Sequence, residues 1–173
     1  MKNWLILALL LPAIAALADD GGQRVHVDLD EVVAAGKVGP VDGITSSGQP
    51  DEAALQVFAD SGYAVVIDMR GADEDRGIED FEGAVEATGM DYVALPVVGR
   101  EAISFETAGK LDALLQEADG PVLIHCGSGN RVGAVLALRE SMHGADDEDA
   151  IEFGKDAGLT RLEPLVREVL EDN

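Results

Sequence analysis

Short apolar runs alternate with longer amphipathic segments along most of the chain, and this alternation restricts its fold more than any other feature. The runs typical of buried strands lie at 63–67, 91–98 and 121–126. Strands that alternate with helices of ten or more residues form βαβ units with right-handed crossovers. The sequence therefore predicts an α/β fold: a single domain with a mainly parallel central sheet flanked by helices.

Capping residues and glycines mark the expected helices. One helix follows Pro50 and ends near Gly62, and another starts at Ser104 and ends near Gly120. Further helices are expected at 80–88, from near Asn130, at 147–155 and at 162–171. Residues 25–29 are typical of a short strand and 30–36 of a helical turn.

The first residues have the layout of a secretory signal peptide. An apolar run over 4–18, broken by Pro12, ends in Ala16-Leu17-Ala18 before two aspartates. The run is shorter than the ~20 residues that a membrane-spanning helix needs. We therefore expect a signal peptide at 1–18, a mature domain at 19–173, a periplasmic or secreted location, and no stable membrane insertion after cleavage.

The acidic composition restricts the partners. The 173 residues, enough for one domain, include 34 acidic and 12 basic side chains, giving a formal net charge of −22 at pH 7. Such a charge disfavours nucleic acid, anionic membranes and long anionic polymers. It leaves small phosphoesters or phosphopeptides open as substrates, and it suits either solvation in a salty medium or an acidic docking face.

The single cysteine, Cys126, ends one of the apolar runs. It cannot form an internal disulfide, so in an exported protein it is either a buried, inert thiol or a reactive group. The residues after it are Gly127, Ser128, Gly129 and Asn130, and they lead into a helix at Arg131.

This turn has the composition of an anion site. Glycines permit tight curvature with inward-facing amides, the helix N-terminus adds positive potential, and Arg131 can bind two oxygens side by side. The same surroundings stabilise a thiolate and can lower the pKa of a cysteine from about 8.5 into the range ~3.5–7.5. The sequence thus predicts that a nucleophile and an anion site coincide at Cys126.

The segment HCGSGNR, from His125 to Arg131, resembles the signature loop of cysteine-dependent phosphatases of the tyrosine and dual-specificity superfamily. The upstream pieces ITSSGQPDEAAL, VVIDMR and YVALPVVG resemble the bacterial branch called beta-lactamase-hydrolase-like phosphatases, and together the pieces cover about 44–142. The resemblance implies a phosphatase-like domain in which Cys126 forms a thiophosphate. The amides of 127–130 and the Arg131 guanidinium would bind the oxygens of the phosphoryl group.

Two features depart from that pattern. Four residues separate Cys126 from Arg131 where the usual phosphatase loop has five, and Val132 stands where a serine or threonine is usual. The shorter loop is the pattern of rhodanese sulfurtransferases, which form a persulfide on the cysteine. A sulfurtransferase and a non-catalytic anion-binding module therefore remain alternatives to the phosphatase.

The related phosphatases take their general acid from the loop after the strand that corresponds to 91–98. The carboxyl group close by in that loop is Glu101, which we assign as the candidate acid. Three further candidates for the general acid follow another strand end: Asp73, Glu74 and Asp75. The alternative is that these carboxylates are ordinary acidic loop surface.

Two more residues are candidate supporting groups. By strand alternation His125 should face away from the pocket, where it either hydrogen-bonds and holds the loop or has no role. Arg70 ends its strand at the same sheet edge and either gathers the anion or pairs with the acidic residues 73–75. His26 and His143 have no partners at metal-ligand spacing, so no metal and no cofactor are expected.

Overall fold

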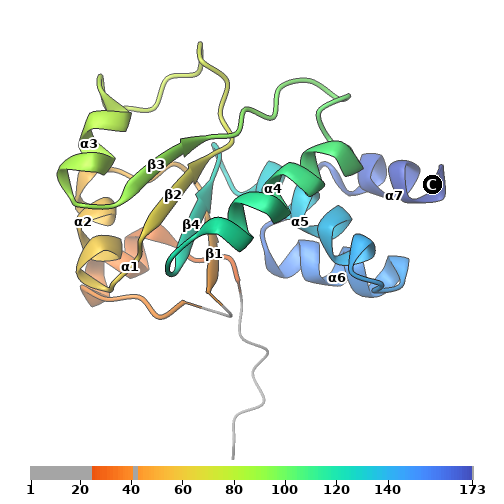
Figure 1. The fold of residues 1–173 in the computed structure, drawn as a ribbon, viewed down its shortest axis with the longest axis horizontal. Helices are drawn as coiled ribbons and strands as arrows, with labels where there is room; N and C mark the ends of the chain where they lie inside the picture. Colours follow the sequence, from red (N-terminus) through yellow and green to blue (C-terminus); the bar gives the residue numbers. More distant parts are fainter. Residues whose placement is uncertain (1–24, 41–42, 173) are drawn as a thin grey trace, which may run out of the picture.

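The computed structural model describes residues 25–40 and 43–172. Four parallel strands form one sheet in the order β1-β4-β2-β3 (Figure 1). The strands are β1 (Ile44–Ser47), β2 (Val65–Asp68), β3 (Asp91–Ala94) and β4 (Val122–His125). Because β4 lies between β1 and β2, the segment that follows His125 emerges near the middle of the carboxyl edge of the sheet.

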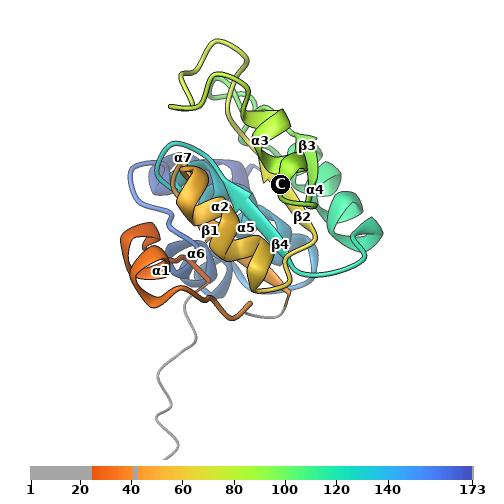
Figure 2. The ribbon, with the colours of Figure 1, turned by 90° about the vertical axis from the view of Figure 1, so that its left-hand side faces the viewer.

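Helices cover both faces of the sheet, as the predicted α/β fold requires. One face carries α1 (Leu29–Ala35), α2 (Glu52–Asp60) and α3 (Phe81–Ala87), and Figure 2 views the molecule from that side. The other face carries α4 (Phe105–Glu117), α5 (Asn130–Met142), α6 (Asp147–Asp156) and α7 (Glu163–Glu171). Each helical layer packs its own apolar cluster against the sheet.

The two central strands supply both clusters. Every residue of β2 and β4 is buried, as expected for parallel strands covered on both sides. Val66 and Leu123 belong to the cluster under α1, α2 and α3, whereas Ile67 and Ile124 belong to the cluster under the other four helices. Alternation along the strands thus divides one sheet between two cores and fixes which side chains reach each face.

Short polar side chains start the helices where the sequence places them. Asp51 accepts a hydrogen bond from the Ala54 N–H (2.8 Å) at the start of α2, and Ser104 accepts one from the Thr107 N–H (3.3 Å) at the start of α4. Each cap satisfies an N–H group that the helix itself cannot pair. The predicted helices at 80–88, 147–155 and 162–171 are also present, as α3, α6 and α7.

The structure differs from the sequence prediction at two places near the N-terminal end of the described chain. Residues 25–29 do not form a strand, because only His26 bridges to Ser46 before Asp28 caps α1. The edge strand β1 was not predicted, since its residues Thr45, Ser46 and Ser47 are polar although buried. Internal hydrogen bonds satisfy these hydroxyl groups: that of Ser46, for example, donates to the Ala157 carbonyl (2.7 Å).

Within the described ranges, no helix is both long enough and apolar enough to cross a membrane. The signal peptide predicted at 1–18 lies outside the described residues.

Candidate active site

Cys126 lies directly after β4, at the carboxyl edge of the sheet, and is almost fully buried. The turn that follows it reaches α5 through Gly129, whose φ of 79° favours glycine. The first amide of α5 with a helical acceptor is that of Gly133, which donates to the Gly129 carbonyl (2.9 Å). The N–H groups of residues 130–132 therefore have no acceptor within the helix, and this end of α5 is electropositive.

Arg131 is held along one edge of its guanidinium. Nη1 and Nη2 donate to the two carboxylate oxygens of Glu74 (2.6 and 2.7 Å), and Nη1 also donates to the carbonyls of Met69 (3.3 Å) and Val97 (3.2 Å). The bonds to Glu74 raise the pKa of Arg131 first, and the nearby Cys126 sulfur raises it further. Because none of these bonds uses Nε, donors remain on the guanidinium for an anion in the Cys126 loop.

Glu74 holds the Arg131 guanidinium in place and is not a general acid, the role that the sequence analysis considered for it. The hydrogen bonds from Arg131 lower the pKa of Glu74 to about 2, against the opposing effect of burial, and the Gly71 N–H also donates to its carboxylate (2.8 Å). An ionised carboxylate with so low a pKa has no proton to give at neutral pH. The reading of Glu74 as ordinary loop surface was also wrong, whereas Asp73 and Asp75 are exposed.

Beneath this loop, β2 supplies a buried carboxylate that the sequence analysis did not single out. Asp68 is fully buried, and its Oδ2 accepts hydrogen bonds from Arg76 Nε (2.6 Å) and the Tyr92 hydroxyl (3.0 Å). Burial and the negative charge of Asp68 raise the pKa of Tyr92 to about 12. The signal was present in the run of four apolar residues before Asp68, since a carboxylate that ends a buried strand needs partners.

His125 lies on the face of the sheet covered by α3. Its ring centroid is 5.0 Å from that of Phe81, and its Nε2 is 3.6 Å from the nearer Asp68 oxygen, beyond hydrogen-bond distance. Neither ring nitrogen has a partner with good hydrogen-bond geometry in the described chain, although burial, which lowers the pKa of His125, is opposed by a contact with the Cys126 backbone. The role of His125 in holding the loop stays a prediction. Burial lowers the pKa of His125 to about 4, although Asp68 opposes the shift, and the ring is neutral at pH 7.

Arg70 joins the two strand ends on either side of β4. Its Nη1 donates to the side chain of Gln49 (3.0 Å), which follows β1, while its Nε lies 3.4 Å from a Glu74 oxygen. The side chain therefore pairs with the acidic loop, one of the two options left open by the sequence. Since β4 lies between β1 and β2, this link spans the carboxyl end of β4.

Asn130 and Ser128, two other predicted residues of the loop, contact neighbouring segments of the chain. The Asn130 side-chain oxygen accepts from the Thr160 N–H (2.8 Å), the Thr160 hydroxyl (3.1 Å) and the Leu162 N–H (3.3 Å), so it ties α5 to the segment before α7. The Asn130 side-chain oxygen is therefore occupied by partners outside the Cys126 loop. Ser128 forms an isolated bridge with Gly48, which closes the loop against the end of β1.

Glu101 is not brought to the Cys126 loop. Its carboxylate lies against Gly99, where an added Cβ would be 2.7 Å from the Glu101 Oε1. It lines a cavity of about 210 Å³ together with Leu165 and Glu168 of α7. Among the described residues no hydrogen bond or ion pair joins Glu101 to residues 126–131, and its assignment as general acid stays a prediction.

The comparisons with known proteins agree with this geometry. Residues 40–142 match the family described as "Beta-lactamase hydrolase-like protein, phosphatase-like domain". The chain belongs to this family. A beta-lactamase hydrolase-like protein of Agrobacterium fabrum (strain C58) is 32% identical over 120 residues, which cover 67% of this chain and 28% of that protein. The chain thus spans less than a third of the length of the curated relatives it matches.

Solved structures show the same fold. A candidate phosphatase from Neisseria meningitidis Z2491 superimposes with a TM-score of 0.63 at 23% identity, over 74% of this chain and 92% of that chain. A kinase-associated phosphatase whose catalytic-site cysteine is replaced by serine gives 0.53 at 16% identity, over 70% and 78%. The fold prediction, including its phosphatase-like character, is confirmed.

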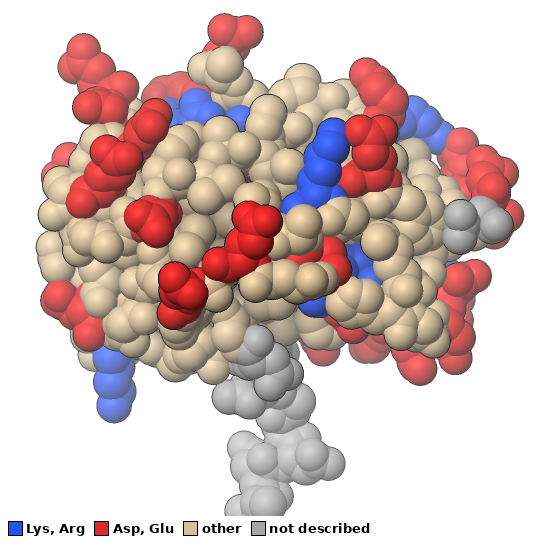
Figure 3. All heavy atoms as spheres, viewed as in Figure 1, with Lys and Arg blue, Asp and Glu red and all other residues tan. Residues whose placement is uncertain are grey.

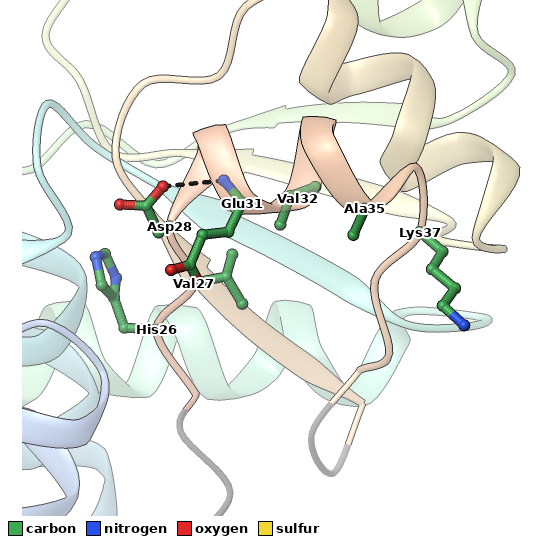
Figure 4. A pocket seen from close by; sticks show the side chains of 7 residues that line it. All are labelled: His26, Val27, Asp28, Glu31, Val32, Ala35 and Lys37. Atoms are coloured by element: carbon green, nitrogen blue, oxygen red, sulfur yellow. Dashed lines mark hydrogen bonds between the residues drawn. The ribbon is translucent and has the colours of Figure 1, made fainter.

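In this phosphatase-like domain, open space lies beside the Cys126 loop. A cavity of about 340 Å³ is bordered by Gly127 and Ser128 on one side and by Asp28 and His26 on the other. His26 and Asp28 also border a second cavity of about 620 Å³, which extends along α1 to Lys37 (Figure 4). The two cavities together leave open space next to the loop.

The two histidines outside the Cys126 loop, His26 and His143, contact polar side chains. Nδ1 of His26 bonds to the Ser46 hydroxyl (3.2 Å), and Nε2 of His143 lies 3.1 Å from an Asp112 oxygen. In residues 25–40 and 43–172, no three His, Cys, Asp or Glu side chains gather in a way that could hold a metal ion.

Proposed function

We propose that the chain is an exported cysteine-dependent phosphatase that hydrolyses phosphomonoesters. The observation that carries the proposal is the Arg131 guanidinium, fixed on one edge by Glu74 and two carbonyls beside the thiol of Cys126. A pre-positioned donor costs no reorganisation when the phosphoryl oxygens gain charge.

The reaction runs in two displacements. The Cys126 thiolate attacks phosphorus, the S–P bond forms, and the P–O bond to the alcohol breaks with its electron pair on the leaving oxygen. Arg131 and the amides of residues 127–130 bind the oxygens that remain on phosphorus. Water then attacks phosphorus, the S–P bond breaks, and inorganic phosphate leaves the regenerated thiolate.

The leaving oxygen needs a proton, and Glu101 remains the proposed donor. Its loop follows β3, the position of the general acid in the related phosphatases. Because its carboxylate lies against Gly99, the role requires the loop to bring it toward Cys126 when substrate binds. An exchange of Glu101 for glutamine tests this: kcat should fall for an ester with a poor leaving group and change little for one with a good leaving group.

Small phosphoesters or phosphopeptides are the proposed substrates. The cavities beside the loop have room for a group larger than phosphate, and Asp28, Asp30 and Glu31 on their walls disfavour further negative charge. The signal-peptide layout of the first residues supports export to the periplasm or beyond. Such a location would require a reductant or shielding for Cys126.

A sulfurtransferase is the second candidate, because the loop of four residues between Cys126 and Arg131 has rhodanese length. In that reaction the thiolate takes the outer sulfur of thiosulfate to form a persulfide and releases sulfite, and cyanide then removes the sulfur as thiocyanate. A binding module without catalysis is the third possibility, favoured by Val132.

One set of assays separates the three. The protein from Asp19 onward, with its Cys126→Ser and Arg131→Lys variants, is offered an aryl phosphate and, separately, thiosulfate with cyanide. The phosphatase proposal expects aryl phosphate turnover that Cys126→Ser abolishes, together with vanadate binding that depends on Arg131. A persulfide mass on Cys126 with no phosphate release would establish the sulfurtransferase instead. Phosphate binding without turnover of either substrate would leave the binding module.

A further inference from the structure

One arginine underneath the Glu74 loop ties that loop to the sheet. Arg76 Nη1 donates to the Glu74 carbonyl (3.0 Å), Nη2 donates to the Arg70 carbonyl (3.3 Å), and Nε donates to Asp68 Oδ2 (2.6 Å). The Arg76 side chain is only 15% exposed. A single planar guanidinium therefore fixes two carbonyls of the loop to a carboxylate in β2.

Asp68 is a fixed attachment point for the Arg76 guanidinium. It is fully buried, and its Oδ1 accepts the Arg70 N–H (2.8 Å) while its Oδ2 serves Arg76 and the Tyr92 hydroxyl. A buried carboxylate with both oxygens occupied has little freedom to move. The position of Arg76 is thus set by the strand and not by the exposed part of the loop.

The same loop carries the carboxylate that orients Arg131. The Glu74 backbone is held by Arg76, its Oε1 accepts the Gly71 N–H, and both of its oxygens bind Arg131. We propose that Arg76 is a positioning residue for the oxyanion site, because it places Glu74 and Glu74 in turn orients the Arg131 guanidinium. The inference rests on the proposed function only in that Arg131 binds the oxyanion.

A lysine cannot replace Arg76 in this role. Its ammonium is a compact point charge and lacks the planar fork that reaches three acceptors in different directions. The Arg76→Lys exchange keeps the positive charge beside Asp68 but frees at least one loop carbonyl. We expect Glu74 to shift with the loop, and shifts of ~1 Å near reacting groups can lower rates by about 100-fold.

The chain offers a matched control in Arg139 of α5. Its side chain is 16% exposed, its Nε donates to Asp112 (2.8 Å), and its Nη1 donates to Glu140 (3.0 Å), so it resembles Arg76 in burial and in the carboxylate bound at Nε. It lies in the last turn of α5, whereas the Cys126 loop precedes the first turn. An Arg139→Lys exchange therefore reports what the loss of a buried arginine fork does to the fold alone.

The experiment measures the binding of inorganic phosphate by calorimetry and the turnover of an aryl phosphate. We expect Arg76→Lys to weaken phosphate binding about tenfold and to lower kcat about 10- to 100-fold, with Arg139→Lys within about twofold of the wild type in both. In a Glu74→Ala background, which removes both side-chain acceptors, the Arg76→Lys exchange should change phosphate affinity less than about twofold, because its effect passes through the Glu74 side chain. Should Arg76→Lys fail to fold, Asp68→Asn replaces it and should weaken phosphate binding about threefold.

Three results would overturn the inference: equal effects of Arg76→Lys and Arg139→Lys, an undiminished effect of Arg76→Lys in the Glu74→Ala background, or no phosphate binding by the wild type. The proposed function fails separately. If aryl phosphate is not turned over while phosphate binding still depends on Arg76, the positioning role holds and the phosphatase activity does not.

Discussion

Replacement of Glu74 by glutamine tests whether its ion pair with Arg131 stabilises the fold. Arg131 lowers the pKa of Glu74 from 4.5 to about 2, which corresponds to at most about 3 kcal/mol at pH 7. The Glu74 side chain is 34% exposed, so solvent screening reduces this value, and glutamine keeps one acceptor for the guanidinium. We expect the Glu74→Gln variant to be less stable by about 1–2 kcal/mol at pH 7.

The pH dependence has a defined sign. A carboxylate whose pKa is lowered by folding stabilises the protein above its unfolded pKa, and the contribution disappears as the pH falls toward the folded pKa. The stability gap between wild type and variant should therefore stay constant from pH 7 to about 5 and narrow between 4.5 and about 2.

Urea unfolding followed by circular dichroism at a series of pH values measures this gap, with Asp73→Asn as an exposed control from the same loop. Equal stability of wild type and Glu74→Gln at pH 7 would refute the anchoring role. A gap that already closes between pH 7 and 5.5 would mean that Glu74 takes up a proton near neutrality, and it would return Glu74 to the list of candidate acids.

Three further exchanges test the fold around the site. Asn130→Ala leaves the Thr160 and neighbouring N–H groups without an acceptor and should cost roughly 2–4 kcal/mol in urea unfolding, whereas Asn130→Asp keeps the acceptor and should cost less. Gly133→Ala places a Cβ against the Leu159 backbone nitrogen and should lower Tm by several degrees, whereas Gly109→Ala, with only a side-chain methyl at 3.7 Å, should not. Wild-type stability should fall by up to about 3 kcal/mol from pH 6.5 to 4 because folding lowers the pKa of His125 to about 4, and His125→Gln should remove this part of the slope.

Sequence patterns predicted the strands that are buried on both faces and the helices that begin at capping residues. The central strands β2 and β4 are apolar on both faces, and α2 and α4 begin at capping side chains, so all four were expected close to their observed bounds. The edge strand β1 escaped prediction because it is polar, and the hydroxyl groups of Thr45 and Ser46 find their partners, Tyr63 and Ala157, far along the chain. Ser46 bonds to Ala157, a contact that depends on the fold and on no local pattern.

The site could be predicted only where its residues are adjacent in sequence. The turn from Cys126 to Arg131 is one continuous segment, so its glycines, amides and arginine could be assigned together from composition. Glu74 is 57 positions from Arg131, and an acidic loop gives no sign of which of its carboxylates meets a distant guanidinium. Glu101 was assigned by the position of its loop, and loops are where sequence position says least about side-chain direction.

The distribution of charge explains why anion binding depends so strongly on the placement of the Arg131 guanidinium. The chain has a net charge of −22, and acidic side chains are prominent on the face shown in Figure 3. At long range an anion is repelled, although salt screens this field beyond about 10 Å at 0.1 M. Among the described residues, the ion pairs at the sheet edge join three arginines, Arg70, Arg76 and Arg131, to two carboxylates, Asp68 and Glu74, which leaves a local excess of positive charge. The attraction from these arginines is short-ranged and acts on an anion that is already in the Cys126 loop. The affinity for the anion therefore depends on the direction in which Arg131 points its free N–H donors.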